Sequence, residues 1–122
     1  MPSAVGCIDK GMGEIRVLAI HTFPVRGEAG VEHTSVQVGE TGLLGDRPKK
    51  AAVSLVGSDA PATRANLVLD VPTERVEALD GSVVRIGEVL LAVQSTGNSC
   101  PGLYASVGDP GSIRVGDSVR PG

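Results

Sequence analysis

The stretch SVVRIGEVLLAVQS, residues 82–95, decides the fold class. Its apolar residues are valine, isoleucine, leucine and alanine, and β-branched side chains fit a pleated strand better than a helix. Gly87-Glu88 interrupts the run, and glycine supplies the backbone freedom that a tight turn or a sheet corner needs. We therefore expect two short strands, or one bent strand. The segment IRVGDSVRP, 113–121, repeats this order of strand, glycine, acidic residue and strand, and predicts a second sharp corner.

Short apolar runs and turn residues alternate through the rest of the chain. Its 122 residues fit one domain, and aromatic residues are only 2% of them, so aliphatic side chains have to build the core. The 17 glycines and 8 prolines indicate many turns. Further strands are expected at 14–25, 34–40, 51–57, 67–71 and 103–107. The pattern predicts an all-β or mostly β fold, either a barrel or a sandwich.

The first of these segments, EIRVLAIHTFPV at 14–25, is apolar on both faces. Strict alternation places Val17, Ala19 and His21 on one face of the strand and the even-numbered residues on the other. A strand with two apolar faces is expected to be central in its sheet.

The segment PTERVEALDG, 72–81, is the best helix candidate of the chain. Thr73 can cap its start, and Asp80-Gly81 can end it. Val76 and Leu79 are three residues apart and are expected to face the core. The helix is only about two turns long, which is short for a helix of a globular domain.

Charge and hydropathy exclude several classes of partner. The formal net charge is −3 and the pI is about 5.3, so neither nucleic acid nor an anionic membrane surface is an expected partner. No apolar run approaches the roughly 18 residues of a membrane helix. The start of the chain lacks the pattern of a secretory signal, and residues 1–13 are expected to be a flexible segment before one domain at 14–122. A cytoplasmic location follows as the expectation, with Cys7 and Cys100 reduced and not joined to each other.

Polar residues that can carry chemistry gather in four short clusters at expected loops or strand ends, where binding groups are concentrated. Arginine suits the planar capture of phosphate or carboxylate, so three arginines on three loops can converge on one anionic ligand. The alternative is that they are solvated charges paired with nearby acidic residues. The candidate site residues are Arg26, Asp46 with Arg47, Arg64 with Asn66, and Asn98 with Cys100.

Cys100 lies in the segment GNSCPG, between polar residues and Pro101-Gly102. A free cysteine is most often buried and inert, whereas a reactive or metal-binding one needs exposure and an electropositive setting that favours the thiolate. No Cys-x-x-Cys pair predicts structural zinc, and no glycine-rich loop followed by a helix predicts a nucleotide phosphate site. The residues alone leave Cys100 open as a nucleophile, a metal ligand or an ordinary thiol.

The order of these clusters resembles the MOSC domain, the C-terminal domain of molybdenum cofactor sulfurases, which also occurs as small stand-alone proteins. The similar segments run from about residue 14 to 120 and stand in the family's order. They are FPVRGEAG, VGETGLLGDR, RANLVL, LDGSVVRIGEVLLAV, GNSCPGLYA and PGSIRVGDSV. The resemblance implies a MOSC-type β-barrel with one or two short helices.

The resemblance also implies a function. Cys100 matches the family's cysteine, which is proposed to carry sulfur as a persulfide or to bind molybdenum as a thiolate. The basic and polar positions of the other motifs, with Asp46 and Asn98, would bind the molybdenum cofactor, molybdopterin, through its phosphate. Pyridoxal phosphate is associated with the family, but no lysine site for it is evident here. The implied partner is a protein that donates sulfur or the cofactor.

Two other functions stay open at this point. One is a non-catalytic binding module whose arginines hold another anionic small molecule or a partner protein. The other is a small cofactor-dependent reductase of N-oxygenated compounds, as the resemblance to larger family members suggests. Whether the protein is an enzyme is therefore left undecided, and no oligomeric state follows from the sequence.

Overall fold

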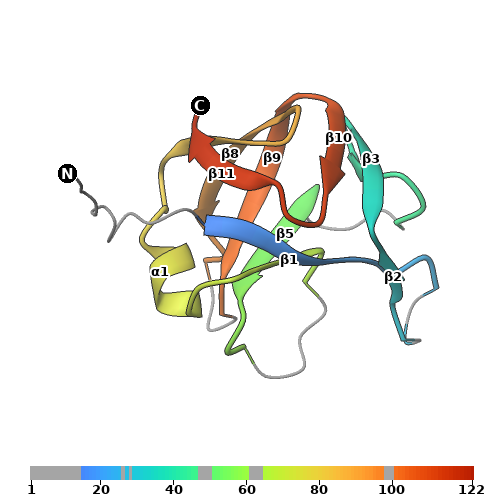
Figure 1. Ribbon diagram of the computed structural model, residues 1–122, viewed down its shortest axis with the longest axis horizontal. Helices are drawn as coiled ribbons and strands as arrows, with labels where there is room; N and C mark the ends of the chain where they lie inside the picture. Colours follow the sequence, from blue (N-terminus) through green and yellow to red (C-terminus); the bar gives the residue numbers. More distant parts are fainter. Residues whose placement is uncertain (1–14, 26, 28, 47–50, 61–64, 98–100) are drawn as a thin grey trace.

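The computed structural model describes residues 15–25, 27, 29–46, 51–60, 65–97 and 101–122. These residues form a mostly β structure in which a single short helix occurs (Figure 1). The predicted fold class is therefore confirmed. The elements are β1 (Ile15–Thr22), β2 (Val31–His33), β3 (Ser35–Gly39), β4 (Gly42–Leu43), β5 (Val53–Gly57), β6 (Leu67–Leu69), α1 (Thr73–Glu77), β7 (Val83–Ile86), β8 (Val89–Ser95), β9 (Leu103–Asp109), β10 (Gly111–Arg114) and β11 (Ser118–Pro121).

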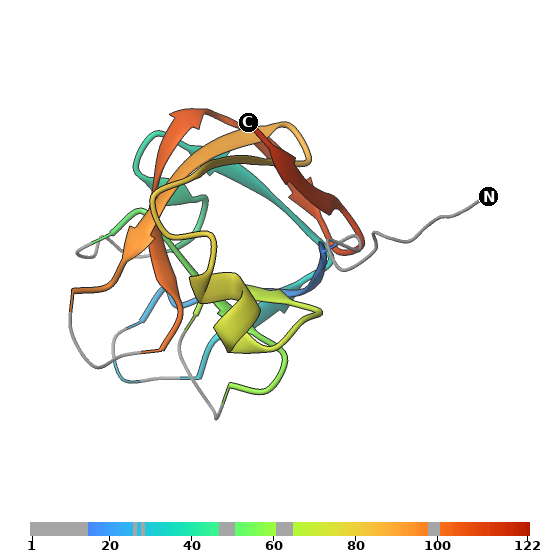
Figure 2. The same ribbon diagram turned by 90° about the vertical axis from the view of Figure 1, so that its left-hand side faces the viewer.

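Seven strands close into a barrel. In Figure 2 the strands form a ring around the centre of the view. Their order is β11-β7-β8-β9-β5-β6-β1, and β11 pairs with β1 to complete the ring. Neighbouring strands are antiparallel except for β5 and β6, which are parallel. Strand β2 extends the sheet beyond β1, and β10, β3 and β4 form a separate three-stranded sheet.

Aliphatic side chains from both sheets and from α1 fill the interior. Val, Leu and Ile make up almost the whole buried cluster, in agreement with the very low aromatic content. Removing such side chains from water is the main favourable contribution to folding. Val76 of α1 is fully buried and Leu79 packs against the same cluster, as the spacing of the helix predicted.

The stretch 82–95 forms the predicted pair of strands. Gly87-Glu88 joins β7 to β8, and Gly87 has φ 58°, a conformation that favours glycine. The related segment 113–121 also bends at a glycine, Gly116, with φ 94°. Its two strands do not pair with each other, since β10 joins β3 while β11 joins β7 and β1. The first glycine therefore makes a hairpin, and the second makes a corner at which the chain changes sheets.

The predicted alternation of the first strand is wrong over its second half. Ile15 and Val17 are buried, but beyond them the buried residues are Ile20 and Thr22. The cause is an irregularity in the pairing of β1 with β6, where the register shifts between Val17 and Ala19. An extra residue of this kind exchanges the two faces of a strand.

Two details of the predicted helix are also corrected. The helix is α1, Thr73–Glu77, and it ends before the predicted Asp80-Gly81. Thr73 lies inside the helix rather than at its cap, which is Pro72 and makes no side-chain cap hydrogen bond. The Thr73 hydroxyl instead accepts a hydrogen bond from Gly57 N at the end of β5, at 3.0 Å. The hydroxyl thus ties the helix to the barrel.

Candidate functional site

Two of the seven predicted site residues, Asp46 and Asn66, lie in the described part of the chain. Asp46 follows β4 and Asn66 precedes β6, so the sequence separates them by 20 positions. The other five predicted residues lie outside the described residues, as does Cys7 of the excluded disulfide. They are Arg26, Arg47, Arg64, Asn98 and Cys100.

Asp46 belongs to the GLLGDR motif, and its carboxylate binds two other predicted motifs directly. Its Oδ1 accepts a hydrogen bond from Phe23 N at 2.7 Å, and its Oδ2 accepts one from Asn66 Nδ2 at 3.2 Å. Phe23 belongs to the FPV segment after β1, and Asn66 to the RAN segment. Three of the four polar clusters therefore meet at one carboxylate, and an ionised acceptor makes such bonds stronger than a neutral one.

Asn66 is fully buried, and its side chain holds three strands together. Nδ2 donates to His21 O of β1 at 3.1 Å as well as to Asp46. Oδ1 accepts from Ser54 N and Ser54 Oγ of β5, at 3.1 and 3.3 Å. Its backbone completes the junction, because Asn66 N donates to Ser54 Oγ at 3.0 Å and Asn66 O accepts from His21 N at 2.8 Å.

These contacts give Asp46 and Asn66 a positioning role. The amide of Asn66 has two N–H donors and one acceptor oxygen, and each of them already has a partner in the protein. We name the hydrogen-bonded set Asp46, Asn66, Ser54, His21 O and Phe23 N the polar node. The prediction that Asp46 and Asn66 contact a cofactor directly stays a prediction.

The fourth motif is attached to the polar node through β5. Ser54 pairs with Tyr104 across the β5–β9 ladder, and Leu55 pairs with Leu103. Strand β9 begins three residues after Cys100, so β5 supports both the node and the chain that follows the cysteine. Ser54 was missed by the sequence analysis because a serine in an apolar strand shows no partner until β6 is placed beside it.

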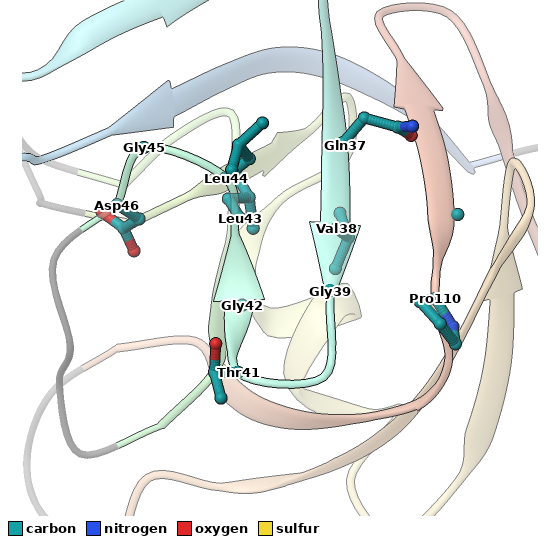
Figure 3. Close-up of a pocket in the computed structure, with 11 residues that line it drawn as sticks. Gln37, Val38, Gly39, Thr41, Gly42, Leu43, Leu44, Gly45, Asp46 and Pro110 are labelled. Atoms are coloured by element: carbon teal, nitrogen blue, oxygen red, sulfur yellow. The ribbon is translucent and has the colours of Figure 1, made fainter.

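A shallow groove opens beside the node on the three-stranded sheet (Figure 3). Its volume is about 550 Å³, and Asp46 lies at one end of it and Pro110 at the other. Four of its lining residues are glycines, and the exposed side chain of Leu44 stands at its edge. The lining residues are Gln37, Val38, Gly39, Thr41, Gly42, Leu43, Leu44, Gly45, Asp46, Pro110 and Gly111.

The two histidines flank the node without forming a metal site. Thr22 Oγ1, nearly fully buried, lies 2.8 Å from His33 Nε2, which pairs β1 with β2. The rings of His21 and Phe23 lie 6.4 Å apart and tilted. Within the described residues, no three His, Cys, Asp or Glu side chains come together as a metal would require. No helix in the same part of the chain is long and apolar enough to cross a membrane.

Comparison with known proteins identifies the fold. No family model and no curated protein matches the chain. Among solved structures it matches the YuaD protein from Bacillus subtilis, with a TM-score of 0.71 and 12% identity, over 87% of this chain and 94% of that one. It also matches YiiM from Escherichia coli, with a TM-score of 0.65 and 20% identity, over 89% of this chain and 69% of that one.

A third match is a structure described only as a hypothetical protein, with a TM-score of 0.69 and 18% identity, over 93% of this chain and 70% of that one. Identities of this size show the fold and leave the activity open. The neighbours therefore support the β-barrel described above as the fold of this chain.

Proposed function

We propose that the protein is a sulfur-carrier or molybdenum-cofactor-binding domain of the MOSC type. Cys100 holds a persulfide sulfur or ligates molybdenum, and Arg26, Arg47 and Arg64 hold the cofactor phosphate. The observation that carries the proposal is the polar node. It gathers the segments next to all three arginines at one end of β1, β5 and β6.

The residue types suit the cofactor. A thiolate is a soft ligand of the kind that thiophilic metals select, and guanidinium groups match phosphate geometry. Asp46 and Asn66 hold the described segments next to those arginines, so they would position the site. When bound, the cofactor would supply a redox-active metal, and this chain would supply the thiolate and the positive charge.

The sulfur-carrier form of the proposal needs only a thiolate and a donor. The Cys100 thiolate attacks the outer sulfur of a persulfide on a donor protein. The S–S bond of the donor breaks, the donor leaves as a thiolate, and Cys100 becomes a persulfide without any net redox change. Positive groups near Cys100 would favour its thiolate form, which is the reactive one.

The test is the composition of the purified protein. It is produced in cells that make molybdopterin, and its molybdenum, its pterin and any added sulfur on Cys100 are measured by metal analysis, fluorescence and mass spectrometry. Either cofactor or persulfide is expected in the unchanged protein and absent from Cys100→Ser. Cys7→Ser is the matched control and keeps whichever of the two the unchanged protein carries. Absence of both from the unchanged protein would refute the proposal.

A second function is supported by the groove beside Asp46. A space of about 550 Å³ that ends at the polar node is large enough for a small molecule that has no need of the cysteine. Arg47 and Arg64 would have to supply the positive charge for an anion, because none of the described residues that line the groove is basic. For this binding module, affinity for a phosphate-bearing probe such as a pterin phosphate survives Cys100→Ala and is lost in Arg47→Ala or Arg64→Ala. If the sulfur or cofactor function holds instead, Cys100→Ala also loses the measured binding or the persulfide.

A further inference from the structure

The loop that contains Cys100 runs from the end of β8 to the start of β9, and the helical segment holds both of its ends. At the first end, Asp80 Oδ1 accepts a hydrogen bond from Ser95 N at 2.8 Å. At the second end, Glu77 Oε2 accepts one from Gly102 N at 2.9 Å. Two carboxylates three residues apart thus bind the two ends of one loop.

The segment that carries these carboxylates is itself fixed to the barrel. Val76, directly before Glu77, is fully buried in the core. Thr73 Oγ1 accepts from Gly57 N at 3.0 Å, and Thr73 N and its hydroxyl donate to Asp59 Oδ1 at 2.8 and 2.9 Å. Beyond the helix, Gly81 N donates to Val93 O at 3.0 Å. A short helix needs such tertiary contacts, because its own hydrogen bonds leave it marginal.

The second end of the loop has no room for a side chain. At Gly102, φ is +91°, and an added Cβ would lie 2.1 Å from Leu55 O of β5. Glycine is therefore required there by both conformation and space. With β5 on one side and the Glu77 carboxylate bound to its N–H, Gly102 is held from two directions.

We propose that Glu77 and Asp80 are positioning residues that act on Cys100 by holding the two ends of its loop. We name this pair the loop clamp. The proposal rests on the proposed function, in which Cys100 acts as a thiolate. It adds that the reactivity of this thiolate depends on two carboxylates of the helical segment, which accept the amide hydrogens at the ends of its loop.

The chemistry separates positioning from charge. Glutamine in place of Glu77 keeps an acceptor oxygen and removes the charge, whereas alanine removes both. If positioning is the role, Glu77→Gln behaves like the unchanged protein and Glu77→Ala does not. A negative charge acting on the thiolate directly would instead make both variants alike, since a carboxylate raises a thiol pKa through space.

The experiment uses a Cys7→Ser background, so that Cys100 is the only thiol of the chain. Backbone amide exchange of Ser95 and Gly102 is followed by NMR, and the rate of Cys100 alkylation by iodoacetamide is followed against pH. Glu77→Ala is expected to raise the exchange rate of Gly102 by about tenfold or more as its hydrogen bond is lost. Asp80→Ala is expected to do the same at Ser95. Glu74→Ala, on the same helix and exposed, is the control.

The pH profile of Cys100 alkylation tests whether the clamp affects the reactivity of the thiolate. In Glu77→Ala, the pH midpoint is expected to rise toward the ordinary thiol value of about 8.5, with at least a roughly threefold slower reaction at pH 7. Glu77→Gln is expected to keep the pH midpoint and the rate at pH 7 of the unchanged protein. Unchanged Gly102 exchange would overturn the clamp, and faster exchange with an unchanged alkylation rate would overturn its positioning role.

The proposed function fails by a different result. A midpoint at the ordinary thiol value in the Cys7→Ser protein itself, with no persulfide or cofactor, would contradict the thiolate role. The loop clamp is then judged by whether Glu77→Ala, unlike Glu77→Gln, still changes the alkylation rate constant.

Discussion

Two sides of the same barrel are held together by different forces. Strands β7 and β8 pair over four residues and strands β8 and β9 over six, with one register shift between Leu90 and Leu91. The buried side chains of these three strands are aliphatic, and we call them the regular side. Strands β1, β5 and β6 overlap over only three pairs at each junction, one with a register shift. At that side the side chain of Asn66 supplies the bonds that the short ladders lack.

The difference shows where this protein can tolerate change. The regular side depends on the amount of apolar surface it buries, and any side chain of similar shape serves. The side formed by β1, β5 and β6, here called the polar side, depends on particular donors and acceptors. A buried polar group that loses its partner costs about 1–3 kcal/mol, because its lost contact with water is not replaced. The polar side also adjoins the predicted basic loops, so in the proposed function the same residues would serve stability and binding.

The largest effect is expected on the regular side. Leu91 of β8 is fully buried in the core, and Leu91→Ala is expected to lower the free energy of unfolding by about 2–5 kcal/mol. Urea unfolding measures it. Leu18→Ala, at a β1 position that is 52% exposed, is the control and should cost less than about 0.5 kcal/mol. Equal costs at the two sites would contradict the described core.

The next effect is expected at the polar node. Asn66→Ala leaves Asp46 Oδ2 and His21 O without this donor, and it should cost about 2–3 kcal/mol although it removes few apolar atoms. The exposed amide Gln94→Ala on β8 is the control, measured by the same urea unfolding. Amide exchange should accelerate at Phe23 and Ser54 and not in β7. Uniform acceleration throughout the barrel would show that the two sides are one unit.

A smaller effect with a pH signature is expected at Asp59. Hydrogen bonds from Thr73 N and then from the Thr73 hydroxyl lower the pKa of Asp59 below its ordinary 3.8. Its folded pKa is below its unfolded pKa, so its contribution to stability is present above about pH 4 and is lost as the pH falls through the folded value. Asp59→Ala should lower Tm at pH 7, and the difference should close below pH 3.8. A Tm difference that stays constant with pH would show that the ionised carboxylate of Asp59 is not the cause.

The smallest effect is expected at an ion pair on the outside of the regular side. Arg85 Nη2 lies 3.2 Å from Asp109 Oδ2, and both side chains are substantially exposed. Asp109→Ala should cost no more than about 1 kcal/mol, and less in about 1 M salt, because solvent screens exposed charges. Arg120→Ala, beside Arg85 on β11, is the control. A cost that is independent of salt would mean that Asp109 acts through packing.

The regular side is also the part that the sequence could predict. Alternation and a turn glycine are local signals, so 82–95 yielded two strands joined at Gly87. The same alternation predicted a half-buried strand at 34–40, which is β3 of the separate three-stranded sheet. The composition, dominated by valine with almost no aromatic residues, indicated the mostly β class for the same reason.

The polar side could not be predicted in the same way. The irregularity in β1 depends on its pairing with β6, and the role of the Thr73 hydroxyl depends on Gly57, 16 positions away. Asp46 and Asn66 were predicted as cofactor-binding residues, and their bond to each other spans 20 positions and carries no local pattern. Ser54 and Glu77 had no signal, since each accepts or donates only after the barrel brings its partner close.

The closing pair of strands, β1 and β11, has a consequence for how the chain folds. Arg16 Nη1 donates to Gly116 O across 100 positions of sequence, at the seam where the ring is completed. During synthesis β1 leaves the ribosome long before β11 is made, so the edge of β1 that pairs with β11 stays unpaired until then. Contacts between such distant segments slow folding, and an unpaired strand edge attracts other chains. Aggregation during production is therefore expected to respond to changes in 118–121 more strongly than the stability of the finished barrel does.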